Sequence, residues 1–338
     1  MRVVMGRRWW QSGAGLLLAS LVFLYGLWQW AIRPVGGDSP IRVVIQPGSS
    51  LRQVGSQLVA AGVIRSRWAW ELWNRWRPWT VKVGTYELDP REDLPGVIRQ
   101  LQSGRTLQVR VTIPEGWRLK QMDDYLRQEL GIPDFLQVAE GWGREDWLPA
   151  AAPSLEGFLF PDTYFLPAEH ASAQALIRAM LRQFQLRALP LWQQHQPPPD
   201  LTLLEWVTLA SIVEKEAVLP QERPLIAGVF WNRLRLGMPL GADPTVEYFL
   251  NIRQTPSRRL TLAEVRTPSP YNTYLNPGLP PGPIASPGLA SLQATLAPAT
   301  TDYLYFVARY DGSHVFSRTL ADHEAAQREI LRRQAAGS

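Results

Sequence analysis

Residues 202–217, TLLEWVTLASIVEKEA, carry the strongest helix signal in the chain, and the rest of the sequence is organised around them. Thr202 with Glu205 three residues later is the S/T-x-x-E pattern of a capping box, which marks the start of a helix. Apolar residues follow on every side of this helix, which is typical of a buried helix and not of a surface one. Pro220 limits its length. We therefore predict a buried helix that ends before Pro220.

Two glutamates, Glu214 and Glu216, lie near the end of this apolar helix. Burying a carboxylate costs free energy unless it is paired, hydrogen-bonded or protonated. At about 100° per residue the two side chains point roughly 200° apart, so they cannot both face one site. A carboxyl between apolar walls has a raised pKa and can serve as a general acid. The alternative from the pattern alone is a fraying last turn, with one glutamate capping and the other in solvent.

Composition excludes several classes of function. The 338 residues suffice for two modest domains after any anchor, and 46% hydrophobic with 19% charged residues is typical of a globular protein. The absence of cysteine excludes disulfides, thiol nucleophiles and thiolate metal sites. Four histidines without H-E-x-x-H spacing argue against zinc, so we expect no metal and no cofactor. A net charge of +5 suits a body near an anionic membrane or wall, and no nucleic-acid motif accompanies it.

Residues 9–32 contain no charged side chain and are long enough to span a membrane. Tryptophans that would form aromatic belts lie at its two ends: Trp9 and Trp10, then Trp28 and Trp30. Three arginines precede the segment and one follows it: Arg2, Arg7 and Arg8, then Arg33. The positive-inside rule therefore places residues 1–8 in the cytoplasm and the body outside it. A cleaved signal peptide is the rival interpretation, but no small-x-small site follows, so we predict an uncleaved anchor and a linker at 34–40.

A β-turn-α pattern occurs twice, about 68 residues apart. Residues 41–48 are predicted to form a strand and a turn, followed by a helix with a serine start signal within 49–62. The second copy spans 108–132, and its apolar positions match those of the first: Ile45, Gly48, Leu51, Val54 and Leu58 correspond to Ile113, Gly116, Leu119, Met122 and Leu126. This suggests a duplicated module. Chance similarity between two amphipathic units remains the alternative.

Five tryptophans lie between the two copies, within residues 66–79: Trp68, Trp70, Trp73, Trp76 and Trp79. Three interpretations remain open from the sequence. The helical spacing of three of them favours packing inside the fold. With neighbouring arginines, the segment would instead suit a membrane surface. Stacking on sugar rings is the third interpretation.

The remaining elements follow from periodicity and turn residues. Before the buried helix we predict these: a strand within 81–90, a short helix within 94–105 closed by Gly104, a polar loop at 131–153, one amphipathic helix at 171–195 and a rigid Pro-rich stop at 197–200. After it we predict these: helices at 222–238, 286–298 and 320–334, a short helix after Asp243 and a hairpin within 302–317.

Residues 269–288, SPYNTYLNPGLPPGPIASPG, are dense in proline and glycine but also hold tyrosines and asparagines. We interpret them as a rigid, ordered loop that lines a cleft, with a simple surface crossover as the alternative. His314, alone in the second strand of the hairpin, is interpreted as a packed or hydrogen-bonded strand residue and not as a ligand.

Several long motifs carry a resemblance to a known family. They are ASIVEKEA at 210–217, AGVFWNRLRLGMPLGADPTVEY at 227–248, the loop at 269–288, YLYFVA at 303–308, HVFS at 314–317, LEGFLFPDTYFL at 155–166 and IRVVIQPG at 41–48. Taken in their order along the chain, they resemble the endolytic murein transglycosylase family, also called the YceG-like family. The resemblance covers roughly residues 41–330. A single N-terminal anchor and a LysM-like module are usual in that family.

The resemblance implies an enzyme that cuts nascent peptidoglycan glycan strands between N-acetylmuramic acid (MurNAc) and N-acetylglucosamine (GlcNAc). It implies 1,6-anhydro-MurNAc ends formed without water, and it makes the first glutamate of E-K-E, here Glu214, the single general acid/base. Seven further residues within family-like motifs are candidates for binding sugar: Glu156, Asn232, Asp243, Thr245, Tyr271, Asn272 and Tyr274. One departure concerns Gly241-Ala242, where more polar residues are expected, so a substrate contact there is in doubt.

The expected fold is α+β: residues 1–8 cytoplasmic, a transmembrane anchor at 9–32, a LysM-like module at 41–108 and a catalytic domain at 109–335 with the second β-α unit at 108–132. The expected location is a bacterial plasma membrane, crossed once, with the catalytic body outside the cytoplasm. Expected partners are peptidoglycan, the membrane and cell-wall synthases such as penicillin-binding proteins, and no nucleic acid. Two rival functions are a non-catalytic peptidoglycan-binding or division scaffold and a water-using muramidase. The muramidase would need a second carboxylate, such as Glu156 or Asp243, near Glu214.

Overall fold

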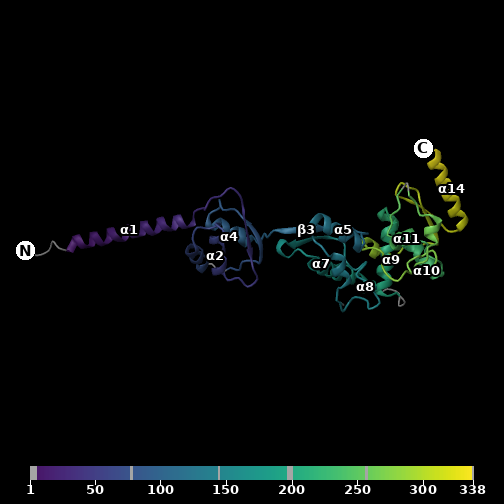
Figure 1. Cartoon of the computed structure of the whole chain (residues 1–338), viewed down its shortest axis with the longest axis horizontal. Helices are drawn as coiled ribbons and strands as arrows, with labels where there is room; N and C mark the ends of the chain where they lie inside the picture. Colours follow the sequence, from purple (N-terminus) through teal and green to yellow (C-terminus); the bar gives the residue numbers. More distant parts are fainter. Residues whose placement is uncertain (1–5, 77–78, 144, 196–200, 256–257, 337–338) are drawn as a thin grey trace, which may run out of the picture. The chain divides into compact units, whose positions relative to one another are not determined.

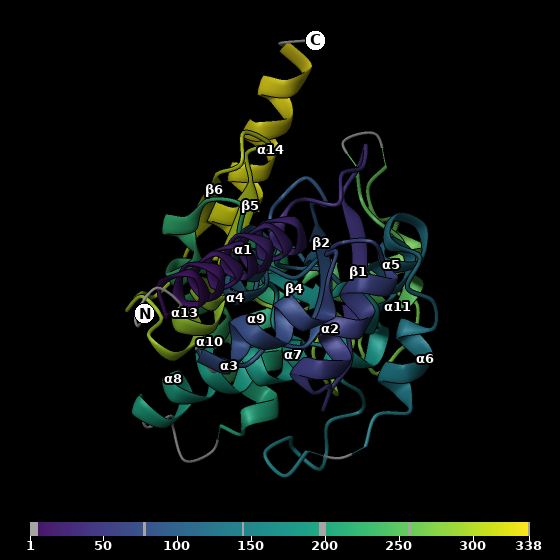
Figure 2. The ribbon, with the colours of Figure 1, turned by 90° about the vertical axis from the view of Figure 1, so that its left-hand side faces the viewer.

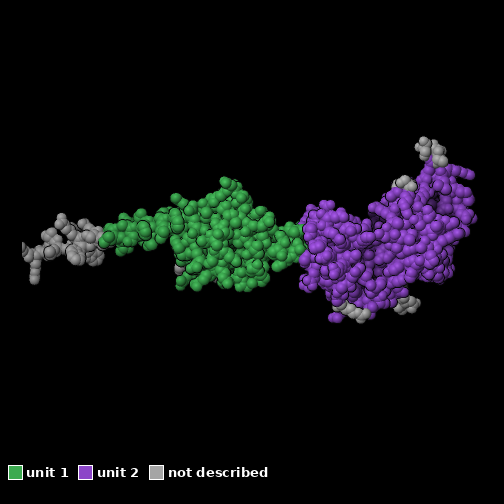
Figure 3. All heavy atoms as spheres, in the orientation of Figure 1, with its two compact units in different colours: residues 1–109, 165–171 green, residues 110–164, 172–338 purple. Residues whose placement is uncertain are grey.

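The computed structural model describes residues 6–76, 79–143, 145–195, 201–255 and 258–336. The chain folds into two compact units (Figure 3). Unit 1 is Met1–Val109 with Phe165–Ala171, and unit 2 is Arg110–Tyr164 with Ser172–Ser338. Helices and short strands occur in both units (Figure 1), so the predicted mixed α+β class is confirmed.

The first helix, α1 (Gly6–Ile32), contains a stretch that is long and apolar enough to cross a membrane. This stretch is Gly15–Ile32, with a mean hydropathy of 1.6 and only 6% of it buried. Residues 1–5 and the side chains of 6–14 lie outside the described part. The three arginines before the apolar segment and the tryptophans of the first predicted aromatic belt are among them.

Unit 1 is built on a two-stranded antiparallel sheet. Strand β1 (Ile41–Ile45) pairs with β2 (Gly84–Leu88), with Val43 opposite Tyr86. Three helices accompany the sheet: α2 (Leu51–Ala60), α3 (Arg67–Trp76) and α4 (Leu94–Ser103). Ser50 forms the predicted cap of α2, and Gly104 closes α4 with φ 64°, as its sequence position indicates.

The tryptophans of α3 and its surroundings pack inside unit 1. Trp70 is fully buried and its Nε1 donates to the carbonyl oxygen of Leu51 at 2.7 Å. Trp73 stacks on Trp28 with ring centroids 6.3 Å apart, and Trp79 lies edge-on to Trp70 at 6.0 Å. The packing interpretation is therefore confirmed for these residues, whereas the side chain of Trp76 lies outside the described part.

The β-turn-α pattern recurs as local structure. The second copy consists of β3 (Gln108–Thr112) and α5 (Leu119–Leu130). Its turn glycine, Gly116, has φ 73°, close to the 78° of Gly48 in the first copy. The paired apolar positions Val54 and Met122 are both fully buried, as are Leu58 and Leu126. Both predicted β-turn-α elements are therefore formed, and their origin as a duplicated module stays a prediction.

Two predictions for residues 131–195 are wrong. The expected polar loop contains a helix, α6 (Phe135–Glu140), and Trp147 stacks on Phe184 with centroids 5.3 Å apart. The expected single helix is two, α7 (Ala173–Arg187) and α8 (Leu189–Gln194). Pro190 lies in the first turn of α8, where its missing N–H and fixed φ are tolerated only at a helix start. The predicted Pro-rich stop at 197–200 lies outside the described residues.

Helix α9 (Leu203–Glu216) lies in the core of unit 2, as the opening stretch predicts. The Thr202–Glu205 capping box is formed, and eight consecutive residues, 206–213, are buried. Packed on α9 are α10 (Arg223–Arg235), α11 (Asp243–Leu250) and α13 (Leu289–Leu296). The remaining elements are β4 (Thr163–Pro167), which pairs with β3, two 3₁₀ turns (Ala168–His170 and Pro220–Glu222) and α12 (Leu262–Val265).

The predicted C-terminal hairpin is present as β5 (Tyr305–Ala308) and β6 (His314–Ser317). Helix α14 (Leu320–Ala336) packs on both strands and projects beyond them (Figures 1 and 2). His314 is buried, and its Nδ1 lies 2.7 Å from a carboxylate oxygen of Glu222. This supports the interpretation of His314 as a hydrogen-bonded strand residue.

A glycine beside α9 provides a first stability prediction. Gly157 has φ 83°, and a Cβ there would lie 2.4 Å from Cβ of Pro283 and 3.0 Å from Val207. We expect Gly157→Ala to lower the free energy of unfolding by about 2–4 kcal/mol, because a strained backbone adds to a clash with a rigid ring. Gly131→Ala is the matched control, since φ is 61° with nothing within 4 Å, and should cost about 1–2 kcal/mol. Equal losses in urea denaturation would contradict the clash.

Candidate active site

Glu214 lies in the last turn of α9, where three hydrogen-bond donors converge on its carboxylate. Its Oε2 accepts from the Ser291 hydroxyl at 2.7 Å and from the Gly288 backbone N–H at 3.0 Å. Its Oε1 lies 3.4 Å from Nη2 of Arg223. Only 6% of the Glu214 side chain is accessible.

The sequence supplies these donors from two other helices. Gly288 is the N-cap of α13 and Ser291 lies in its first turn, so the carboxylate of Glu214 sits at a helix N-terminus. Arg223 opens α10, and its Nε also donates to the Ser291 hydroxyl at 3.1 Å. The expectation that Glu214 lies between apolar walls is therefore wrong, because charged and polar donors surround its oxygens.

A second carboxyl, that of Glu115, lies beside this cluster. Its oxygens occupy the space that a Cβ on Gly288 would need, with Oε1 only 2.0 Å from that position. Glu115 is solvent-exposed on its other side. Burial against the loop raises the pKa of Glu115, and the charge of Glu214 raises it further, while Arg223 opposes the shift. Glu115 and Glu214 thus both contact one glycine.

Backbone hydrogen bonds fix Glu115 in this position. The N–H of Gly116 donates to the carbonyl of Ser286, and the N–H of Ser286 donates to the carbonyl of Trp117, both at 2.8 Å. Nζ of Lys215, the neighbour of Glu214, donates to the Gly116 carbonyl at 3.4 Å. The Pro-Glu-Gly turn is therefore tied both to the loop at 269–288 and to α9.

Four residues of this cluster were missed from the sequence: Glu115, Arg223, Gly288 and Ser291. Gly116 corresponds to Gly48 of the first copy, but the glutamate before Gly116 has no counterpart there, and this difference is the signal that the sequence offers. Arg223 and Ser291 reach Glu214 from helices that only the tertiary fold brings together.

Glu216 points to a different part of unit 2, as the 200° separation requires. It lines a cavity of about 540 Å³ with Asp243, Tyr274 and Arg233 among its other walls. Burial raises the pKa of Glu216 to about 8, and the nearby charges of Asp243 and Glu247 add to the shift. Two separate carboxyl environments therefore flank the end of α9.

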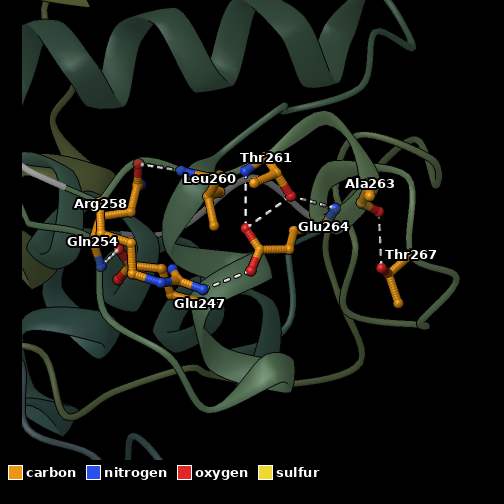
Figure 4. Close-up of polar contacts among 8 residues, drawn as sticks. All are labelled: Glu247, Gln254, Arg258, Leu260, Thr261, Ala263, Glu264 and Thr267. Carbon is orange, nitrogen blue, oxygen red and sulfur yellow. Dashed lines mark hydrogen bonds and ion pairs between the residues drawn. The ribbon is translucent and has the colours of Figure 1, made fainter.

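Of the seven sugar-binding candidates, Asp243 and Tyr274 meet in this cavity. The Tyr274 hydroxyl donates to Asp243, and Nε2 of Gln254 donates to it at 3.0 Å. Gln254 belongs to a hydrogen-bonded segment, in which its N–H donates to Glu247 and its side-chain oxygen accepts from Leu260 N–H (Figure 4). The same segment ends in the capping box of Thr261 and Glu264 (Figure 4).

The other five candidates serve the fold in this structure. Asn272 and Thr245 are fully buried, with their side chains bonded to nearby backbone and to Thr273. The Asn232 side chain donates to the carbonyls of Thr301 and Tyr303. Tyr271 is half-buried against Tyr248, and Glu156 is buried at the start of α5. None of these five approaches Glu214 through a described contact, and their role in binding sugar stays a prediction.

Glu156 leads to a prediction for stability against pH. Its carboxyl accepts from Leu119 N–H at 3.2 Å, and burial raises its pKa to about 8 despite that bond and the charge of Arg118. Between pH 4.5 and 8 the folded chain holds a proton that the unfolded chain has lost. The free energy of unfolding therefore falls as pH rises through this window. We expect Glu156→Gln to remove the share of that fall that Glu156 causes. The free energy of unfolding of this variant should therefore rise relative to the wild type from pH 5 to pH 8.

Thermal or urea unfolding of the full chain across this range measures the effect. Glu129→Gln is the control, since Glu129 is exposed on α5. Parallel curves for the wild type and Glu156→Gln would contradict a buried, protonated Glu156.

The carboxyls of Glu214 and Glu115 are suited to proton transfer. Within the described residues, no group of three or more His, Asp or Glu side chains is placed to hold a metal ion. The cluster instead offers one carboxylate that accepts three donors and a second, exposed carboxyl whose raised pKa favours a bound proton. Such a pair can give a proton to one atom of a substrate and take one from another.

Comparison with known proteins gives a consistent result. The sequence profile of the YceG-like family matches residues 43–329. A Bacillus subtilis protein named endolytic murein transglycosylase is 32% identical, covering 93% of this chain and 91% of its own length. A Streptococcus pneumoniae protein of the same name is 29% identical, and 91% of this chain matches only 62% of that longer protein.

A solved structure is also similar. The crystal structure of a putative YceG-like protein from Listeria monocytogenes has a TM-score of 0.58 and 30% sequence identity, covering 86% of this chain and 99% of that one. Together with the profile match over most of the sequence, this shows that the chain belongs to the YceG-like family.

Proposed function

We propose that this protein is a peptidoglycan lytic transglycosylase. The relatives that match it over most of its length are named endolytic murein transglycosylases, which places murein, the peptidoglycan of bacterial walls, as the substrate. The finer reaction is cleavage of nascent glycan strands between MurNAc and GlcNAc, leaving 1,6-anhydro-MurNAc ends.

Glu214 is the catalytic carboxyl in this proposal, in the general acid/base role that the resemblance to the family implies. The supporting observation is its position at the N-terminus of α13, where Ser291, Gly288 and Arg223 orient both oxygens. A carboxylate held in one orientation can accept the proton of the C6 hydroxyl as that oxygen attacks C1. Since the substrate supplies its own nucleophile, no covalent enzyme intermediate is needed.

The anchor and the N-terminal module complete the proposal. Helix α1 would cross the plasma membrane of a bacterium once, with the N-terminus in the cytoplasm and the catalytic body outside. The module at 41–108, which contains the first β-turn-α unit, would be LysM-like and bind glycan. Cell-wall synthases, which make the strands at the same membrane surface, would be its protein partners.

Product mass tests the proposed reaction. The full chain in detergent is incubated with uncrosslinked glycan strands, and the released fragments are weighed. We expect ends that are lighter by one water than hydrolytic ends. Fragments with water added would instead indicate a muramidase, which the second carboxyl near Glu214 would suit. No fragments at all would overturn the proposal and favour a binding scaffold.

A further inference from the structure

We propose that Glu115 is a second catalytic carboxyl, which donates the proton to the departing glycosidic oxygen while Glu214 accepts the proton of the attacking hydroxyl. This inference rests on the proposed function, because it needs a glycan to be cut at this site. In this inference Glu115 acts as the acid and Glu214 as the base, whereas in a single-carboxyl mechanism Glu214 would perform both roles in turn.

The first support is the shared contact with Gly288. The N–H of Gly288 donates to Glu214 at 3.0 Å, while the Glu115 carboxyl lies over the Cα of the same glycine. A Cβ on Gly288 would meet Oε1, Cδ and Oε2 of Glu115 at 2.0, 2.1 and 2.6 Å. Any other residue at 288 would thus displace the Glu115 carboxyl.

The second support is the difference in hydrogen bonding between the two groups. Three donors from α10 and α13 reach Glu214, and these are the contacts that a carboxylate accepts. Among the described residues, none donates a hydrogen bond to the Glu115 carboxyl. Partial burial raises the pKa of Glu115, and the charge of Glu214 raises it further against the opposing charge of Arg223, so the Glu115 carboxyl binds a proton more readily than an ordinary glutamate does.

The third support is accessibility. Glu115 is exposed, whereas only 6% of the Glu214 side chain is accessible. A glycan strand that approaches from solvent would therefore reach Glu115 directly. The turn that carries Glu115 is nonetheless fixed, because Gly116 and Trp117 both exchange backbone bonds with Ser286.

The reaction balances with these two groups alone. The proton of Glu115 moves to the glycosidic oxygen as the bond from that oxygen to C1 of MurNAc breaks. The bond from O6 to C1 forms as the O6 proton moves to Glu214. Glu115 is then ionised and Glu214 protonated, and one proton passing back from Glu214 to Glu115 restores the starting state.

The test compares two leaving groups. The phenol of a nitrophenyl glycoside has a low pKa, so its phenolate departs without a proton from a general acid. One substrate is uncrosslinked glycan, and the other is a GlcNAc–MurNAc tetrasaccharide whose reducing MurNAc carries a β-4-nitrophenyl group. We expect Glu115→Gln in the full chain to cut natural glycan about 10²–10³-fold more slowly and to release nitrophenolate within tenfold of the wild type. It should also lose the alkaline limb of the pH–rate profile.

Two further variants separate chemistry from folding. Gly288→Ala should reproduce the loss on natural glycan at an unchanged melting temperature, since the displaced Glu115 side chain is free to move into solvent. Glu129→Gln, an exposed glutamate on α5, should match the wild type.

The inference would be overturned if Glu115→Gln lost the same fraction of its rate on both substrates. It would also be overturned if Glu115→Gln cut natural glycan as fast as the wild type does. In either case the wild type still forms anhydro ends, so the proposed function stands. If the wild type cuts neither substrate, the proposed function and this inference fail together.

Discussion

Glu214→Gln is expected to lower the rate at which anhydro ends form by about 10³-fold, within the range that general acid–base catalysis contributes. Glutamine has nearly the same shape, so Ser291 and Gly288 keep an acceptor and the fold is retained. What is lost is the ability to accept the proton of the C6 hydroxyl. The rate is measured by mass spectrometry of fragments from uncrosslinked glycan, with the full chain in detergent.

Glu216→Gln is the matched control on the same helix. The Glu216 carboxyl lies in the separate cavity with Asp243, and its pKa of about 8 leaves it largely protonated at neutral pH. A neutral amide therefore changes little in the fold, and activity should stay within tenfold of the wild type. If Glu216→Gln abolished cleavage while Glu214→Gln preserved it, the catalytic carboxyl would be in the cavity and the assignment to Glu214 would be wrong.

The central helix was predictable because its signals are local. A capping box at Thr202, an apolar run and a proline beyond the end define α9 without reference to any other part of the chain. The angle between Glu214 and Glu216 follows from helix geometry alone, and the structure places them in different surroundings. The sequence also contains the signal for the break between α7 and α8, because Pro190 lies inside the single helix that was expected at 171–195.

The environment of Glu214 was not predictable, because it depends on long-range contacts. Its partners are separated from it by 9, 74 and 77 positions in the sequence. Spacing along one helix predicts which way a side chain points but not what it meets there. Apolar neighbours in α9 suggested an apolar niche, whereas the structure brings an arginine, a serine and a helix N-terminus to the carboxylate.

The largest loss of stability is expected from Trp206→Ala, at about 3–5 kcal/mol of unfolding free energy. Trp206 is fully buried in α9, and its ring stacks on Trp192 of α8 with centroids 5.2 Å apart. Its Nε1 donates to the carbonyl of Leu292 in α13 at 3.0 Å. Truncation leaves a cavity the size of an indole ring between three helices. Urea denaturation of the full chain, followed by circular dichroism, measures the change.

Trp206→Phe separates packing from the hydrogen bond. The carbonyl of Leu292 also accepts from the Thr295 hydroxyl at 3.0 Å, so loss of the indole N–H does not leave it unpaired. We therefore expect Trp206→Phe to cost only about 1–2 kcal/mol, mainly through the smaller ring. Helix α13 also carries Gly288 and Ser291, two of the donors to Glu214. Since Trp206→Phe keeps α13 packed on α9, this variant should still cleave glycan at temperatures where it is folded. A cost equal to that of Trp206→Ala would show that the hydrogen bond, and not the packing, holds α13 against α9.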